Sequence, residues 1–98
     1  MGKKPEPAEL IKVNGTTETV KPRNGKNFTL NELYKLLNCK MIELVKTHDD
    51  RTMVIDEEGK LNEMSWMMTN AHATIMYKYG ADDPIVGDAL VCDNRQIK

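Results

Sequence analysis

The sequence has 98 residues, of which 40% are hydrophobic and 30% charged, and its formal net charge is −1. This length predicts one domain, and the composition excludes a disordered chain and a membrane protein. No apolar run approaches the ~20 residues of a membrane span, and no signal-peptide core is present. We therefore expect a cytoplasmic protein that has no membrane partner.

The charge is divided unevenly along the chain, since residues 1–46 carry +4 and residues 47–98 carry −5. Residues 1–7 contain two prolines and no apolar periodicity, which predicts a disordered N-terminal tail. A single domain over residues 8–98 is expected to follow it.

Two strand-like runs come first, over residues 10–13 and 16–20, with Asn14-Gly15 between them. An Asn-Gly pair between two such runs is typical of a β-hairpin. A second hairpin is expected from the strand-like runs 41–46 and 52–56, which His48-Asp49-Asp50 connects.

A helix is predicted between the two hairpins. Thr29 and Glu32 have the spacing of a capping box, which marks a helix start, and Asn38 suits its end. Phe28 and Leu33 have the spacing of a hydrophobic staple. The expected apolar face of this helix comprises Leu30, Leu33, Tyr34 and Leu37.

A second helix is predicted by apolar residues that recur at helical spacing. Asn70 suits its N-cap, and Gly80 suits the position after its last turn. The stripe expected to lie on the sheet comprises Met68, Ala71, His72, Ile75, Met76 and Tyr79. A last strand is expected over residues 85–92, with a bulge at Gly87-Asp88.

The expected architecture is a small α+β domain. Two antiparallel hairpins and a C-terminal strand pack with two helices, in the order ββαββ(α)αβ, where residues 61–69 form a connecting or short helical segment.

Four soft metal ligands occur, each alone in the sequence: Cys39, His48, His72 and Cys92. A zinc site needs paired ligands at short spacing, and the acidic runs fit no calcium-loop register. We therefore expect no metal and no cofactor. His72 is expected to be a core histidine, and both cysteines are expected to be buried thiols.

Enzyme motifs are also missing from the sequence. The only serine, Ser65, lacks the small flanking residues of a nucleophile elbow, and no phosphate-binding glycine loop occurs. The sequence thus favours a non-enzymatic protein that binds a macromolecule, in the first place a protein, and that could form a homodimer. A small hydrolase whose carboxylates or thiol assemble only in space is the second alternative, after a nucleic-acid-binding accessory protein.

Basic residues around the first hairpin define the first alternative, a nucleic-acid-binding accessory protein. Lys12, Lys21, Arg23 and Lys26 are its candidate contacts, because such residues bind phosphates. No aromatic residue lies among them to stack on bases, so the sequence favours a solvated loop as their explanation.

Residues 64–68 hold four large apolar side chains in five positions. Either this segment fills the end of the core, or it exposes Trp66, Met67 and Met68 to a partner, because Trp and Met are enriched at interface centres. These three residues are the candidate partner-binding site.

A series of short motifs in the chain resembles a small family catalogued only as a domain of unknown function. The motifs are Val13-Asn14-Gly15, Phe28-Thr29-Leu30 with Glu32-Leu33, Ile42-Glu43-Leu44-Val45, Met53-Val54 with Asp56-Glu57-Glu58-Gly59-Lys60-Leu61, Asn70 with Ala73-Thr74, and Ile85-Val86-Gly87-Asp88. The resemblance covers residues 10–92, and the chain departs from it at residues 64–68, where the family often has prolines. It implies an accessory protein of a phage, a virus or a bacterial mobile element, and it carries over no catalytic residue.

Overall fold

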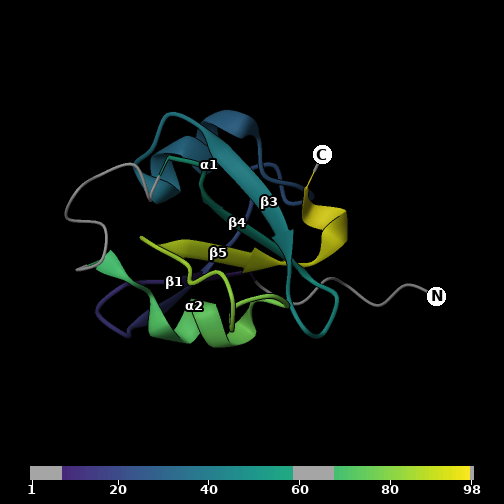
Figure 1. The fold of residues 1–98 in the computed structure, drawn as a ribbon. Helices are drawn as coiled ribbons and strands as arrows, with labels where there is room; N and C mark the ends of the chain where they lie inside the picture. Colours follow the sequence, from purple (N-terminus) through teal and green to yellow (C-terminus); the bar gives the residue numbers. More distant parts are fainter. Residues whose placement is uncertain (1–7, 59–67, 98) are drawn as a thin grey trace.

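The computed structural model describes residues 8–58 and 68–97 and confirms the expected α+β class (Figure 1). The predicted tail at residues 1–7 lies outside the described residues, as does nearly all of the connecting segment. The elements are β1 (Ala8–Ile11), β2 (Thr17–Val20), α1 (Leu30–Leu37), β3 (Ile42–Lys46), β4 (Thr52–Asp56), α2 (Ala71–Met76), β5 (Ala89–Cys92) and a one-turn 3-10 helix η2 (Asn94–Gln96).

The strands form one antiparallel sheet in the order β2-β1-β5-β4-β3, with α1 and α2 on opposite faces (Figure 1). β5 lies between the two hairpins and joins them. The register places Leu10, Leu90, Val54 and Leu44 side by side across four strands. Neighbouring residues in register share a face, and Leu10, Val54 and Leu90 belong to one buried cluster with Leu33 and Leu37 of α1. This row therefore lies on the α1 side of the sheet.

The first hairpin is confirmed, with different bounds. β1 begins at Ala8 and pairs with β2 as far as Ile11 opposite Thr17. Lys12 N donates to Thr16 O at 2.9 Å, which leaves a three-residue loop that ends in Gly15 at φ +92°. This is the second commonest hairpin geometry, a turn followed by a left-handed residue, in place of the two-residue turn that the Asn-Gly pair favours.

The start and end of α1 lie where the sequence predicts them. The Thr29 side chain accepts from Glu32 N and the Glu32 carboxylate accepts from Thr29 N, while Asn38 closes the helix in the left-handed conformation. Phe28, Leu33 and Leu37 are buried against the sheet. Leu30 was expected on the same face, but it is 53% exposed.

The predicted stripe on α2 is wrong in phase. The residues that pack against the sheet are Ala73, Met76 and Tyr77, whereas His72 is exposed and Ile75 is 74% exposed. Asn70 caps the helix as expected, but the helix ends at Met76 because the chain leaves it to pair with the end of β3. The helix therefore approaches the sheet through the small side chain of Ala73. Of the predicted stripe, Met76 packs on the sheet, whereas Ile75 and Tyr79 are exposed.

The last strand is also shorter than predicted, since β5 begins only at Ala89. Val86 pairs with Thr69 in an isolated bridge, and the Asp88 carboxylate accepts from Val13 N at 3.0 Å. Residues 85–88 are thus held by contacts outside the β5 ladder. The second hairpin, β3 with β4, forms as predicted, with Ile42 opposite Asp56.

Candidate functional site

The predicted partner-binding residues can be assessed only in part. Trp66 and Met67 lie outside the described residues. Met68 is 50% exposed, and its carbonyl accepts from Gly87 N at 2.8 Å. The proposal that this segment forms an interface therefore stays a prediction.

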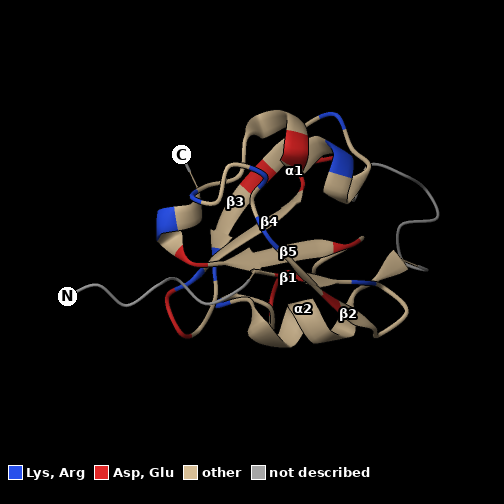
Figure 2. Ribbon diagram, turned by 180° about the vertical axis from the view of Figure 1, so that it is seen from behind, with Lys and Arg blue, Asp and Glu red and all other residues tan. Residues whose placement is uncertain are grey.

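The four basic candidates do not form one cluster. Lys12 lies at the turn of the first hairpin, where its ammonium is 3.4 Å from the Glu18 carboxylate. Lys21 follows the opposite end of β2, after about 17 Å of extended chain. Arg23 and Lys26 lie in the loop before α1, and Figure 2 shows basic and acidic segments interspersed over this side of the molecule.

The candidate metal ligands are likewise not brought together. Within residues 8–58 and 68–97, no group of three or more His, Cys, Asp or Glu side chains could hold a metal ion. Cys92 is buried, and this burial raises the pKa of its thiol to about 11. Cys39 is only half buried, contrary to the prediction, and burial followed by the charges of Asp56 and Glu58 raises its pKa. Both thiols thus stay protonated near neutral pH, the less nucleophilic form.

A different candidate site lies at β3, which forms one edge of the sheet. Glu57 N donates to Met41 O at one end of the β3–β4 ladder, and Thr47 N donates to Arg51 O at the other. Since hydrogen-bonded residues alternate along an antiparallel ladder, the odd-numbered residues of β3 bond to β4. The backbone groups of the even-numbered residues therefore point away from the sheet.

One end of this outer edge is covered by the chain itself. Lys78 N donates to Lys46 O at 3.0 Å, and His48 N donates to Met76 O at 2.9 Å. Among the described residues, no backbone hydrogen bond reaches the outward groups of Ile42 and Leu44. The outer edge of β3 is consequently closed at Lys46 and open at Ile42 and Leu44, a part that we call the open edge.

An apolar groove of about 460 Å³ lies beside the open edge, on the α1 face. Leu30 and Leu44 form its exposed part, at 53% and 50% exposure. α1 contacts β4 and β5, so it leaves Leu44 at the end of its apolar row only half covered. The groove is lined by Phe28, Thr29, Leu30, Leu33, Ile42, Leu44 and Ile97.

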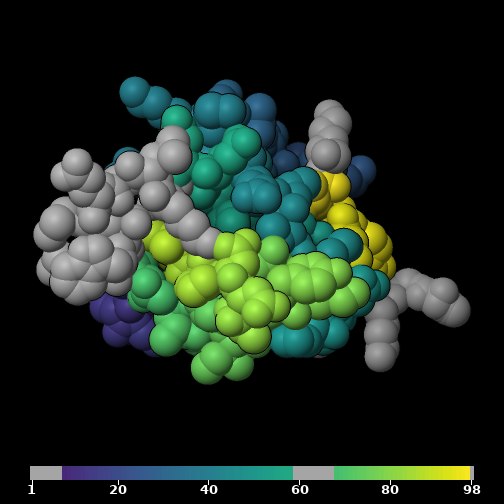
Figure 3. All heavy atoms as spheres, viewed as in Figure 1, coloured from purple at the N-terminus to yellow at the C-terminus, as the bar shows by residue number. Residues whose placement is uncertain are grey.

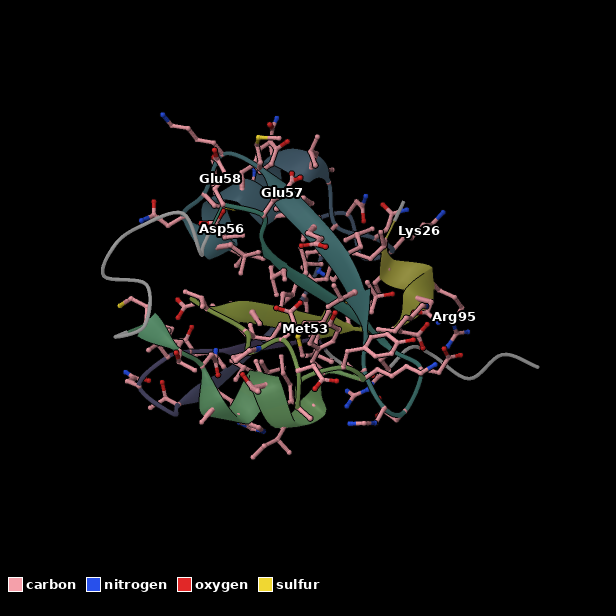
Figure 4. The ribbon with its side chains drawn as sticks, in the orientation of Figure 1. Lys26, Met53, Asp56, Glu57, Glu58 and Arg95 are labelled. Atoms are coloured by element: carbon pink, nitrogen blue, oxygen red, sulfur yellow. The ribbon has the colours of Figure 1, made fainter. Side chains whose placement is uncertain are left out.

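The opposite face of β3 carries an acidic pocket of about 190 Å³. Glu43, Glu57 and Asp83 line it, and no basic residue of the described chain does. Asp56 also borders it, but pairs in register with Ile42, so its side chain belongs to the α1 face. On this face, the atoms of β3 and β4 meet those of the segment after α2 (Figure 3). Figure 4 shows Asp56 and Glu57 at one end of the sheet, away from Lys26 and Arg95. β3 thus separates an apolar groove from an acidic pocket.

Sequence reasoning found β3 as a strand but missed its role as an edge. The strand order depends on how β5 inserts between the two hairpins, and nothing local to residues 42–46 shows this. The signal that the sequence did offer was alternation, with Ile42 and Leu44 on one face and Glu43 on the other.

The fold and this site define a small α+β domain with a partly open sheet edge. The chain belongs to the family described as Domain of unknown function (DUF3846), whose model matches residues 5–97. The resemblance to a family of unknown function is thereby confirmed. No curated protein and no solved structure matches the chain. None of the helices in the described ranges has the length and hydropathy needed to cross a bilayer.

Proposed function

We propose that the chain is a small non-enzymatic accessory protein of a phage or mobile element, and that it binds an extended segment of a protein partner as an added strand at the open edge. The observation that carries this proposal is the outward orientation of the Ile42 and Leu44 backbone groups beside an exposed apolar groove. Addition of a strand to a sheet edge is a recurrent way to bind peptides, because the backbone supplies affinity and flanking pockets supply specificity.

The contrast with the other edge of the sheet supports this choice. Thr17, Glu18 and Thr19 of β2 are exposed and polar, which is a usual protection against unwanted pairing. β3 has Ile42, Leu44 and Val45 in its five positions, and Leu44 is half exposed. β3 also carries the charged Glu43 and Lys46, so it differs from β2 in its exposed apolar Leu44 and in having no outward backbone partner at Ile42 and Leu44 among the described residues. This part of the edge suits a partner better than it suits solvent.

The accessory role is further supported by the resemblance of the sequence motifs, which implies a protein of a phage, a virus or a bacterial mobile element. The two other functions named from the sequence gain no such support. The basic residues are spread over both ends of the first hairpin, and both thiols have raised pKa values.

The test uses a peptide of about eight residues that alternates Val and Thr, a length typical of strands. Titrated into ¹⁵N-labelled protein, it should shift the amide signals of Ile42 and Leu44 and of the groove residues around Leu30. Two versions of this peptide are N-methylated on alternate amides, one on the odd-numbered amides and one on the even-numbered amides. One version should lose binding and the other should retain it, because only alternate amides face β3. Shifts confined to β2, or equal binding of both methylated peptides, would refute strand addition at β3.

A further inference from the structure

The two faces of β3 differ in chemistry, and a strand added to the open edge would meet both of them. Its alternate side chains would point to opposite faces, as in any strand. On the α1 face they would lie beside Leu44 and Leu30 in the apolar groove. On the other face they would lie beside Glu43 and Glu57 in the acidic pocket.

We infer that the segment bound at β3 alternates apolar residues with lysine or arginine. This inference rests on the proposed function and specifies the partner. Strand pairs between Ile42 or Leu44 and an antiparallel partner are hydrogen-bonded pairs, so Glu43 occupies a non-hydrogen-bonded pair, in which the two Cα atoms approach to about 4.5 Å. A basic residue at that position faces the Glu43 carboxylate directly, and such opposite-charge pairs are favourable across strands.

Glu43 is available for this contact. Its side chain is exposed, and no ion pair or side-chain hydrogen bond to it is present among the described residues. The nearest residue across the ladder is Ile55, which offers no charge. The carboxylate of Glu43 therefore has no neutralising neighbour within its own strand pair.

The same charge argues against a second copy of this chain as the occupant. Two β3 strands that pair antiparallel with Ile42 opposite Leu44 place Glu43 opposite Glu43, and like charges directly opposite are destabilising. A pairing centred on Leu44 would require the backbone of Lys46, whose carbonyl already accepts from Lys78 N. A basic peptide meets neither obstacle.

The experiment compares three peptides of about eight residues, in which Val alternates with Lys, with Thr or with Glu. At ~50 mM salt, the Lys peptide should bind about ten-fold more tightly than the Glu peptide, and the preference should shrink at ~0.5 M salt. Glu43→Gln should remove most of this preference and leave binding of the Thr peptide unchanged. Glu18→Gln, which makes the same charge change on β2, should alter neither.

The outcomes separate the two proposals. Equal binding of all three peptides at Ile42 and Leu44 would overturn the charge preference and leave strand addition intact, whereas binding of none of them there would overturn both. The Lys peptide could instead shift amide signals mainly outside β3, or its advantage over the Glu peptide could survive Glu43→Gln. Either result would show attraction to acidic surface alone and would also overturn the inference. A concentration-dependent dimer that Leu44→Pro abolishes would identify a second copy as the occupant instead.

Discussion

Thr47 lies opposite Tyr77 in an isolated antiparallel bridge just beyond the end of β3. The hydrogen bonds on either side of this bridge close the edge of the sheet at Lys46 and His48. Two residues earlier, at Leu44, the same edge has no backbone partner among residues 8–58 and 68–97. The segment after α2 thus covers one part of the edge, and we propose that a partner strand covers the other.

Leu44→Pro should separate binding from folding. Because the Leu44 N–H points away from β4, proline there removes an outward donor and leaves the β3–β4 hydrogen bonds in place. We expect a folded protein that no longer binds the alternating peptides, measured by circular dichroism and by NMR titration.

Two variants serve as controls for that change. Leu44→Ala removes the apolar side chain and keeps the N–H, so it should weaken binding without abolishing it. Glu43→Pro removes a donor that faces β4, so it should destabilise the hairpin strongly. Full peptide binding by folded Leu44→Pro would contradict strand addition.

Thr29→Ala should lower the free energy of unfolding by about 1 kcal/mol, because it removes the side chain that caps α1. Chemical denaturation of the variant and the parent measures the difference. Coincident denaturation midpoints would show that the cap contributes nothing to stability.

The Glu32 side of the same capping box predicts a pH dependence. Hydrogen bonds from the backbone N–H groups of Thr29 and Arg23 hold the pKa of Glu32 below its usual value. A carboxylate with a lowered pKa stabilises the fold above its unfolded-state pKa, and this contribution is lost as the pH falls through its folded-state value. The stability difference between the parent and Glu32→Gln should therefore shrink between about pH 6 and pH 3. A difference that stays constant over this range would contradict the assignment.

Asn70→Ala should be far more damaging than His72→Ala, although both residues lie at the start of α2. The buried Asn70 amide donates to Ile11 O at 2.9 Å and to Gly87 O at 3.0 Å, while its Oδ1 accepts from Ala73 N. Removal of one partner of a buried hydrogen bond typically lowers the stability by about 1–3 kcal/mol. His72→Ala changes an exposed side chain and should lower the stability by less than about 0.5 kcal/mol. Similar melting temperatures for the two variants would contradict this role of Asn70.

These two residues also show how far the sequence could predict the fold. Asn70 was found as an N-cap, because capping depends on the residue itself and on the few that follow it. The burial of His72 was predicted wrongly, since the same apolar spacing fits two helix phases about one residue apart. Only the tight packing of Ala73 and the exit of the chain at Tyr77 decide between them.

The candidate site illustrates the same limit at longer range. Residues 42–46 were predicted as a strand from their own side chains, but the open edge depends on the strand order and on Lys78, which lies far along the chain. Long-range pairing of this kind leaves no local signal. Residues 64–68, with Trp66 and three methionines, were more conspicuous in composition, and their role stays a prediction.

Gly80→Ala should destabilise the turn that follows α2. A Cβ at this position would lie 1.8 Å from the carbonyl oxygen of Thr74, which is a backbone atom and cannot move alone. Overpacking of this kind typically costs about 1–3 kcal/mol. Ala81→Ser, at the exposed neighbouring position, should leave the melting temperature nearly unchanged. A Gly80→Ala protein as stable as its parent would show that the turn relaxes freely.

Amide hydrogen exchange at Leu44 tests the open edge most directly. In the free protein, the Leu44 N–H should exchange rapidly while those of Glu43 and Val45, which bond to β4, are protected. Addition of the Val-Lys peptide should then slow exchange at Leu44 without changing its neighbours to the same extent. Strand addition at β3 would be contradicted if, in the free protein, the Leu44 amide were as protected as that of Val45. It would also be contradicted if the Leu44 amide stayed unprotected when the peptide is bound.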